Sequence, residues 1–201
     1  MLNRFLQNTR KPKGFLGRFM LRGMNKGHAA LSQWAVSYLP LKKEARILDV
    51  GCGGGANVAA LLTKVPEGGV DGLDYSAESV AWSRKVNAKN LGPRCTITQG
   101  DVAHLPYSDH SLDVVTAFET IYFWPDLTAA FREIQRVLKP GGTFFICCES
   151  QDSTDTTWTD RIQGMTVYRG DDLKERLEAL GFHNVSQHHH PKGWFALTAT
   201  R

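Results

Sequence analysis

The chain of 201 residues lacks several features that would define a specialised class of protein. No run approaches about 18 uninterrupted apolar residues, so a membrane-spanning helix is not expected. No secretory leader is recognisable either. The cysteines form no C-x-x-C pair, which argues against a disulfide framework and a zinc site. They are Cys52, Cys95, Cys147 and Cys148. The reducing cytoplasm is the simplest expected location.

Acidic residues are missing from residues 1–43, which contain nine Lys and Arg. The whole chain has a net charge of +4, so residues 44–201 carry a net charge of 4 − 9 = −5. A proline and two glycines interrupt this basic start, which argues against an amphipathic transit peptide. Residues 1–27 are open to three interpretations: a solvated arm, a lid over an anionic ligand, or a docking segment for nucleic acid or a membrane surface. As a lid, the arm would offer Lys13, Arg18 and Arg22 to a carboxylate.

Segments with strand and helix patterns alternate through most of the chain. Strands are expected at 45–50, 69–75, 95–101, 112–118 and 143–149. Amphipathic spacing, capping residues and Pro or Gly stops predict helices at 28–39, 58–65, 77–90, 127–138 and from 171 or 172 to 180. Such alternation is typical of a parallel sheet wound by right-handed crossovers.

The end of the chain departs from this alternation. Residues 184–190 and 193–200 have strand character and are separated by a two-residue break, which predicts a hairpin. One of these two strands must therefore run antiparallel to its neighbour. No linker divides the chain, so we expect one domain over residues 28–201, with the polar segment 150–168 as a connector on the substrate side.

The stretch ILDVGCGGGANVAALL (47–62) places four glycines between a strand and a helix. A glycine-rich turn at the carboxyl end of the first strand is where open α/β sheets bind nucleotides. Glycine admits a ligand close to the backbone, and the helix that follows favours an anion. The pattern G-x-G-x-x-A, with Asp74 ending the next strand, also fits a dinucleotide site. A tight turn that binds nothing is the structural alternative, and the missing Gly-Lys-Ser/Thr excludes a kinase-type phosphate loop.

Four motifs together resemble the class I S-adenosylmethionine-dependent methyltransferases. They are LDVGCGGG (48–55), DGLDYS (71–76), GDVAHLPYSDHSLDVV (100–115) and LKPGG (138–142), in the family's order and spacing. The resemblance is strongest to the small-molecule branch related to ubiquinone and menaquinone methyltransferases. It implies an α/β, Rossmann-like, doubly wound sheet of seven strands, mostly parallel with an antiparallel C-terminal strand.

The resemblance also implies how S-adenosylmethionine, the expected cofactor, would be held. Asp49 would face the ammonium of its methionine part, and Asp74 would accept hydrogen bonds from both ribose hydroxyls. Asp101 would bind the adenine amino group. The alternative for Asp74 and Asp101 is helix capping or turn formation. The other expected cofactor residues are Gly51, Cys52 and Gly53 beside the methionine part, Tyr75 and Ser76 beside the ribose and adenine, Val102 at an adenine ring nitrogen, and Phe118 near the methionine chain.

The methyl acceptor is expected over the segment FETIYFWPD (118–126), which is rich in aromatic residues. Tyr122 and Trp124 would form walls of the acceptor site, and Glu119 would serve as a general base or bind an acceptor amine. In the alternative interpretation Phe123 and Trp124 fold into the core and Glu119 caps the next turn. The segment lacks the Asn-Pro-Pro-Tyr signature of methyltransferases that act on planar amino groups.

Further substrate contacts are expected from Trp158 and Tyr168 in the connector and from His28 at the start of the first helix. The run His188-His189-His190 does not predict a metal site, because successive side chains of a strand point to opposite faces. No metal is therefore expected. Sheet-surface histidines are the preferred interpretation of this run.

We expect an enzyme that transfers a methyl group to a small molecule and acts as a monomer or homodimer. Two alternatives remain: an RNA- or protein-modifying methyltransferase that docks through its basic arm, and a catalytically inactive S-adenosylmethionine-binding protein. A nicotinamide oxidoreductase fits the motifs less well.

Overall fold

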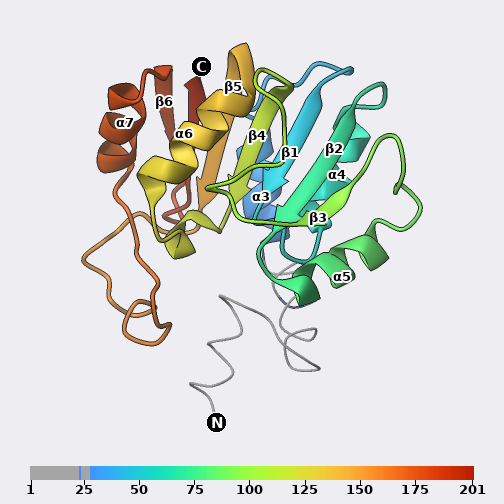
Figure 1. Ribbon diagram of the computed structural model, residues 1–201. Coiled ribbons are helices and arrows are strands. Elements are labelled where there is room, and N and C mark those ends of the chain that lie inside the picture. Colours follow the sequence, from blue (N-terminus) through green and yellow to red (C-terminus); the bar gives the residue numbers. More distant parts are fainter. Residues whose placement is uncertain (1–22, 24–27) are drawn as a thin grey trace.

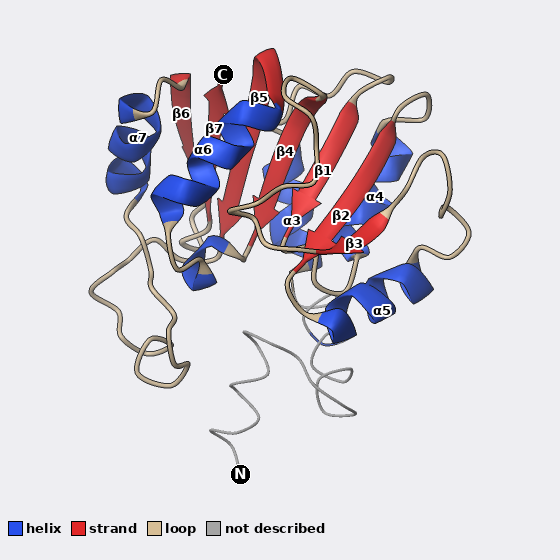
Figure 2. Ribbon diagram, viewed as in Figure 1, coloured by secondary structure: helices blue, strands red, loops and turns tan. Residues whose placement is uncertain are grey.

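The computed structural model describes residue 23 and residues 28–201 (Figure 1). The basic arm, with Lys13, Arg18 and Arg22, lies outside the described residues apart from Gly23. The core of the described chain is one seven-stranded sheet with helices on both faces (Figure 2). No helix of the described residues is both long enough and apolar enough to cross a bilayer.

The strand order is β3-β2-β1-β4-β5-β7-β6. β7 is antiparallel to both neighbours, and the other pairs are parallel. The strands are β1 (Arg46–Val50), β2 (Gly69–Asp74), β3 (Ile97–Gln99), β4 (Leu112–Phe118), β5 (Leu138–Cys148), β6 (His183–His189) and β7 (Phe195–Thr200). This arrangement confirms the predicted doubly wound sheet and its antiparallel C-terminal strand.

The helices divide between the two faces of the sheet and each face has its own apolar core. α6 and α7 cover one face, where Phe131, Ile134 and Leu177 are fully buried against strand residues. α3, α4 and α5 cover the other face with residues such as Leu61. Each such buried side chain contributes about 1.5–3 kcal/mol. The helices are α3 (Ala29–Val36), α4 (Ala56–Lys64), α5 (Ala77–Val86), η2 (Ile121–Phe123), α6 (Leu127–Val137) and α7 (Gly170–Ala179).

Two helices begin with the caps expected from the sequence, whereas α7 begins at Gly170 instead of the predicted Asp171 or Asp172. The side chain of Asp126 accepts the Ala129 amide at 2.9 Å at the start of α6, and Ser76 accepts the Ser79 amide at 3.4 Å at the start of α5. α5 ends at Val86, earlier than predicted, since the next residues form turns.

β3 and β5 differ from their predicted limits. β3 is shorter than the predicted 95–101 because Asp101 enters a separate two-residue bridge with His104. β5 is longer than predicted because Leu138 already pairs with Leu112 before an irregularity shifts the register. These differences leave the carboxyl ends of the strands where the motifs predict them.

Candidate active site

The carboxyl ends of β1, β2 and β4 meet at one edge of the sheet, and a cavity of about 450 Å³ lies there. That volume lies within the range of small-molecule sites. The residues lining it are Gly51, Leu73, Asp74, Tyr75, Gly100, Asp101, Val102, Thr120, Phe123, Trp124 and Pro125. Six of the residues predicted from the sequence therefore share one cavity: Gly51, Asp74, Tyr75, Asp101, Val102 and Trp124.

The glycine loop bends sharply between β1 and α4, and two of its glycines illustrate different requirements. Gly55 has φ +76°, and a Cβ there would lie 2.3 Å from the Ser83 hydroxyl oxygen and 2.6 Å from the Asn87 amide nitrogen. Gly53 has φ +50°, but the nearest atom to a Cβ there, the Gly51 carbonyl oxygen, is 3.9 Å away. Packing explains Gly55, so the tight-turn interpretation accounts for part of the loop. The open space beside Gly53 suits the close approach of a ligand.

Asp49 is a buried carboxylate at the tip of β1, with 1% of its surface exposed. Its Oδ1 accepts a hydrogen bond of 2.7 Å from the Thr116 hydroxyl on β4. Its Oδ2 is buried and accepts no hydrogen bond from the described residues. Burial raises the pKa of Asp49 to about 7, opposed by the Thr116 hydrogen bond and reinforced by the charge of Asp74. A buried oxygen without a donor suits a cationic or hydrogen-bonding ligand group.

Thr116 was not identified from the sequence. The only available signal was a polar residue among the apolar residues that follow Asp113 in the strand LDVVTAF. The register places Thr116 directly beside Asp49 in the neighbouring strand, which sequence patterns cannot specify.

Asp74 is held by backbone groups at the tip of β2. Its Oδ2 accepts the Gly53 amide and its Oδ1 accepts the Ser76 amide, both at 2.8 Å. Burial raises the pKa of Asp74, and the amides of Ser76 and Gly53 oppose that shift. Each carboxylate oxygen can accept a second hydrogen bond. The side chain is therefore fixed in orientation and able to accept two hydroxyl groups.

The remaining predicted cofactor residues occupy different surroundings. Asp101 is exposed and its Oδ1 accepts the Ala103 amide at 3.0 Å, so it forms a turn and also lines the cavity. Val102 is buried beside it, Tyr75 is exposed, and Ser76 is buried as the cap of α5.

Two predicted cofactor residues turn away from this cavity. The Cys52 thiol is buried near the Ser83 hydroxyl, 3.9 Å away, and belongs to the core beneath α4. Cys52 can thus offer the cavity its backbone but not its thiol. Phe118 packs against Phe145 with a ring separation of 5.4 Å.

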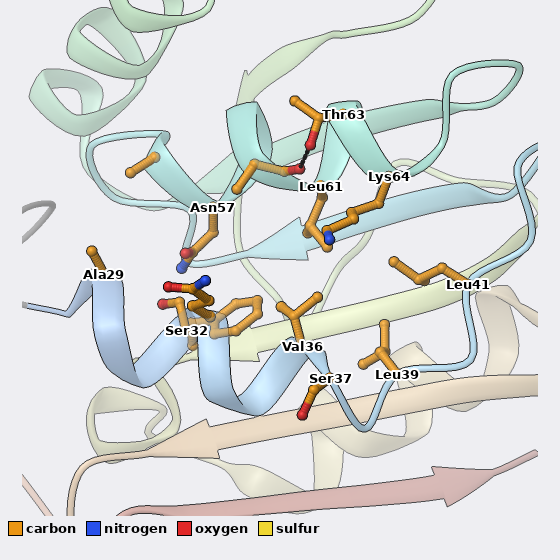
Figure 3. Close-up of a pocket in the computed structure, with 14 residues that line it drawn as sticks. Ala29, Ser32, Val36, Ser37, Leu39, Leu41, Asn57, Leu61, Thr63 and Lys64 are labelled. Atoms are coloured by element: carbon orange, nitrogen blue, oxygen red, sulfur yellow. Dashed lines mark hydrogen bonds between the residues drawn. The ribbon is translucent and has the colours of Figure 1, made fainter.

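Phe118 instead lines a second cavity of about 680 Å³ between α3 and α4. Figure 3 shows Ser32 and Val36 on α3 facing Asn57 and Leu61 on α4 across this space. Sequence patterns did not indicate this cavity, because the packing of α3 against α4 leaves no local signature in either helix.

Glu119 follows β4 directly and has φ +55°, a conformation rare for residues other than glycine. Its Oε1 accepts the Glu149 amide at the tip of β5 and lies 3.5 Å from the Tyr122 hydroxyl oxygen. Burial raises the pKa of Glu119 to about 8, opposed by the Glu149 amide. The Tyr122 hydroxyl donates to the Ser150 carbonyl at 3.2 Å, and burial raises the pKa of that hydroxyl.

His28 lies beside this group at the start of α3. Its Nε2 is 3.9 Å from Glu149 Oε2, and burial lowers the pKa of its imidazole. The structure thus brings together His28, Glu119 and Tyr122, three residues predicted for the acceptor side. Glu149 was missed, and its only signal was its place as the last residue of the fifth predicted strand.

Trp124 is buried and packs against Phe131, while its Nε1 donates to the Thr120 hydroxyl at 3.3 Å. It is therefore largely a core residue, as in the alternative interpretation, although it also lines the cavity. In the connector, Trp158 is 46% exposed and Tyr168 packs on the core. The connector meets the acceptor side where the Thr166 amide donates to the Tyr122 carbonyl at 2.9 Å.

The three consecutive histidines contact aromatic residues. His188 stacks on Tyr38 with a ring separation of 3.9 Å, and His190 stacks on Trp194 at 4.4 Å. His190 also meets Trp34 of α3 edge-on at 5.3 Å. These rings help to fasten α3 to the C-terminal strands.

Comparison with known proteins agrees with this geometry. Residues 48–146 match the family described as "Methyltransferase domain". Demethylmenaquinone methyltransferase of Lactobacillus johnsonii is 40% identical over 106 residues, covering 52% of this chain and 43% of the relative. Sterol 24-C-methyltransferase of Aspergillus fumigatus is 36% identical over 107 residues, covering 52% of this chain and 28% of the relative. The matched part thus spans less than half of the length of either relative.

A solved structure shares the fold over most of the chain. The S-adenosylmethionine-dependent methyltransferase from Aquifex aeolicus superimposes with a TM-score of 0.76 at 19% identity, covering 91% of this chain and 97% of that one. Identity this low supports the fold alone, whereas the family match covers the glycine loop and the acids of β1, β2 and the turn after β3. The chain therefore contains a methyltransferase domain of the class I, S-adenosylmethionine-dependent type.

Proposed function

We propose that this chain transfers a methyl group from S-adenosylmethionine to a small-molecule acceptor. The observation that carries the proposal is the convergence of Asp74, Asp101 and the glycine loop on one cavity, with the unpartnered Oδ2 of Asp49 beneath the loop. Each acid suits a different part of the cofactor, and all lie at the carboxyl edge of the sheet, where open α/β sheets bind ligands.

The residues present fit the cofactor group by group. Asp49 offers a buried, unpartnered oxygen to the ammonium of the methionine part. Asp74 presents two oxygens that are oriented by backbone amides toward a vicinal diol. Asp101 and Val102 line the same cavity and would bind the adenine edge.

When bound, S-adenosylmethionine supplies a methyl group on a positively charged sulfur that leaves readily as a neutral thioether. Asp49, the glycine loop and Asp74 would hold this cofactor so that the acceptor could displace the sulfur in line and take the methyl group. The protein mainly aligns the acceptor and excludes water. Glu119 would take a proton from the acceptor, with its Oε1 held by the Glu149 amide.

A small acceptor is supported by two observations. The two matched relatives are named for menaquinone and sterol methylation, and both acceptors are small molecules. The cavity also has aromatic walls from Phe123 and Trp124. The alternatives remain a methyltransferase of RNA or protein and an inactive binding protein.

Calorimetry with S-adenosylhomocysteine tests the cofactor site. We expect Asp74→Ala to weaken binding about 100-fold, because charge-assisted hydrogen bonds contribute about 1.5–3 kcal/mol each and about 1.4 kcal/mol corresponds to tenfold. Asp74→Asn, which keeps the side-chain shape, should lose less. Glu67→Ala is the matched control, since Glu67 is exposed just before β2, at the opposite end of that strand. Unchanged affinity in Asp74→Ala, or saturable NAD binding in place of S-adenosylhomocysteine, would reject the proposal.

A further inference from the structure

A second group of polar side chains lies beyond the cofactor residues, at the carboxyl ends of β4 and β5. His28, Glu119 and Glu149 each offer one ligand atom, and the three atoms lie within 4.8 Å of one another. They come from three segments that are distant in sequence: the start of α3, the residue after β4 and the residue after β5. Only the folded sheet brings them together.

The donor set is an imidazole nitrogen and two carboxylates. Zinc, manganese and iron(II) accept this mixture of nitrogen and oxygen ligands, whereas magnesium and calcium prefer oxygen alone. Three protein ligands also match a catalytic rather than a structural metal site, because further coordination positions stay open.

The charges around the group favour a cation. Within the described part of the chain, neither Glu119 nor Glu149 forms an ion pair with a lysine or arginine. The only pairing of either carboxylate there is the 3.9 Å contact of Glu149 with His28. Two carboxylates this close repel one another unless a cation or a proton lies between them.

Neighbouring groups already orient one of the carboxylates. Glu119 Oε1 accepts the Glu149 amide and lies beside the Tyr122 hydroxyl, so its other oxygen, Oε2, is the atom offered to a ligand. Such outer contacts fix the orientation of metal ligands in proteins. Metal bonds of about 2.0–2.2 Å require the three ligand atoms to draw closer. Glu149 has the exposure for that rotation, since 59% of its side chain is accessible.

We propose that His28, Glu119 and Glu149 form a binding site for one divalent transition-metal ion. Resting on the proposed function, the site would select acceptors with an oxygen donor, such as a hydroxyl or enol group, that completes the coordination. A metal-bound hydroxyl loses its proton more readily. The proton would leave to water, and the resulting oxyanion would be aligned at the edge of β4 and β5.

The test uses the full chain, stripped with a chelator and titrated with Co²⁺, whose visible spectrum reports the ligands directly. One equivalent should bind with d–d bands and without the strong near-ultraviolet band of a thiolate, so binding by the buried cysteines would be recognised. Glu119→Gln and Glu149→Gln should each weaken binding at least tenfold, and the double variant should abolish it. Thermal melting checks that each variant is folded.

The matched control is His183→Gln, which removes an exposed imidazole at the start of β6, at the end of the sheet opposite to the proposed ligands. Stoichiometric binding should persist in this control. The proposal is overturned if the double glutamate variant still binds one Co²⁺, if the histidine control loses binding, or if the wild type binds none of Co²⁺, Zn²⁺ and Mn²⁺. The last outcome would favour a cationic acceptor or a basic side chain as the partner of these carboxylates.

Calorimetry with S-adenosylhomocysteine on the same samples separates the two proposals. A chain that binds S-adenosylhomocysteine but no metal disproves the metal site alone. A chain that binds Co²⁺ through these residues but no S-adenosylhomocysteine disproves the proposed function and leaves the metal site standing.

Discussion

The candidate active site has a cofactor half at the ends of β1 and β2 and an acceptor half at the ends of β4 and β5. The two halves are held together in different ways. On the side of β1 and β2, backbone groups fix the site: the Gly53 and Ser76 amides hold Asp74, and the glycine loop is shaped by its own φ angles. On the side of β4 and β5, side chains from separate segments create it, with His28 and Glu149 more than 100 positions apart. The cofactor half is therefore local in sequence, and the acceptor half exists only in the folded chain.

The largest effect that tests this contrast lies in the glycine loop. Gly55→Ala should destabilise the protein by about 3 kcal/mol, because a strained backbone is combined with a clash against Ser83 and Asn87. For a chain of this size that corresponds to a fall of roughly 6–12 °C in melting temperature. Gly53→Ala should cost only about 1 kcal/mol, since its Cβ meets open space.

Binding should show the opposite order. Gly53→Ala is expected to weaken S-adenosylhomocysteine binding at least tenfold in a folded protein, because the new methyl group occupies the space proposed for the ligand. If Gly53→Ala binds S-adenosylhomocysteine normally, Gly53 and Gly55 both serve only to form the turn. The glycine loop would then contribute less to the cofactor half than we infer.

The sequence predicted the cofactor half more completely than the acceptor half. Asp49, Asp74 and Asp101 each end or follow a predicted strand, so parallel strands had to bring them to one edge. The direction of a side chain was harder to predict. Cys52 lies in the expected loop, but its thiol points into the core. Whether a loop side chain faces the core or a cavity depends on the packing around it, which a sequence pattern does not specify.

In the acceptor half, the residue types were noticed but their partners were not. Glu119 and Tyr122 stood out as a polar and an aromatic residue in one loop, whereas Glu149 had no local pattern around it. Contacts across strands depend on register, and the contact of Trp34 with His190 depends on where a helix docks. Neither leaves a periodic signal in one sequence.

A second test concerns pH and uses Asp49. Its folded pKa of about 7 lies above its ordinary value of 3.8, so the stability it contributes is present below about pH 3.8 and is lost as the pH rises through 7. As the pH rises from 5 to 8, the free energy of unfolding of Asp49→Asn should therefore increase relative to that of the wild type, by on the order of 2 kcal/mol. Denaturant unfolding at both pH values measures this difference.

Ligand binding should respond to pH in the opposite direction. An ammonium partner requires ionised Asp49, so the wild type should bind S-adenosylhomocysteine about tenfold more tightly at pH 8 than at pH 6. Asp49→Asn should lose affinity and the dependence on pH together. A wild-type affinity that stays flat over this range would mean that Asp49 does not meet the ammonium, and the unpartnered oxygen would need another explanation.

The smallest effect is expected in the connector, at the outer limit of the acceptor half. Trp158 is 46% exposed, so Trp158→Ala should change the free energy of unfolding by less than about 0.5 kcal/mol. It should leave S-adenosylhomocysteine binding unchanged, because no predicted cofactor residue lies in the connector. If residues 150–168 form a wall of the acceptor site, the variant should raise KM for the acceptor severalfold while kcat stays nearly constant, since only contacts made equally in the bound substrate and the transition state are lost. Trp82→Ala on α5 is the matched control, and equal KM values for the two variants would remove the connector from the acceptor half.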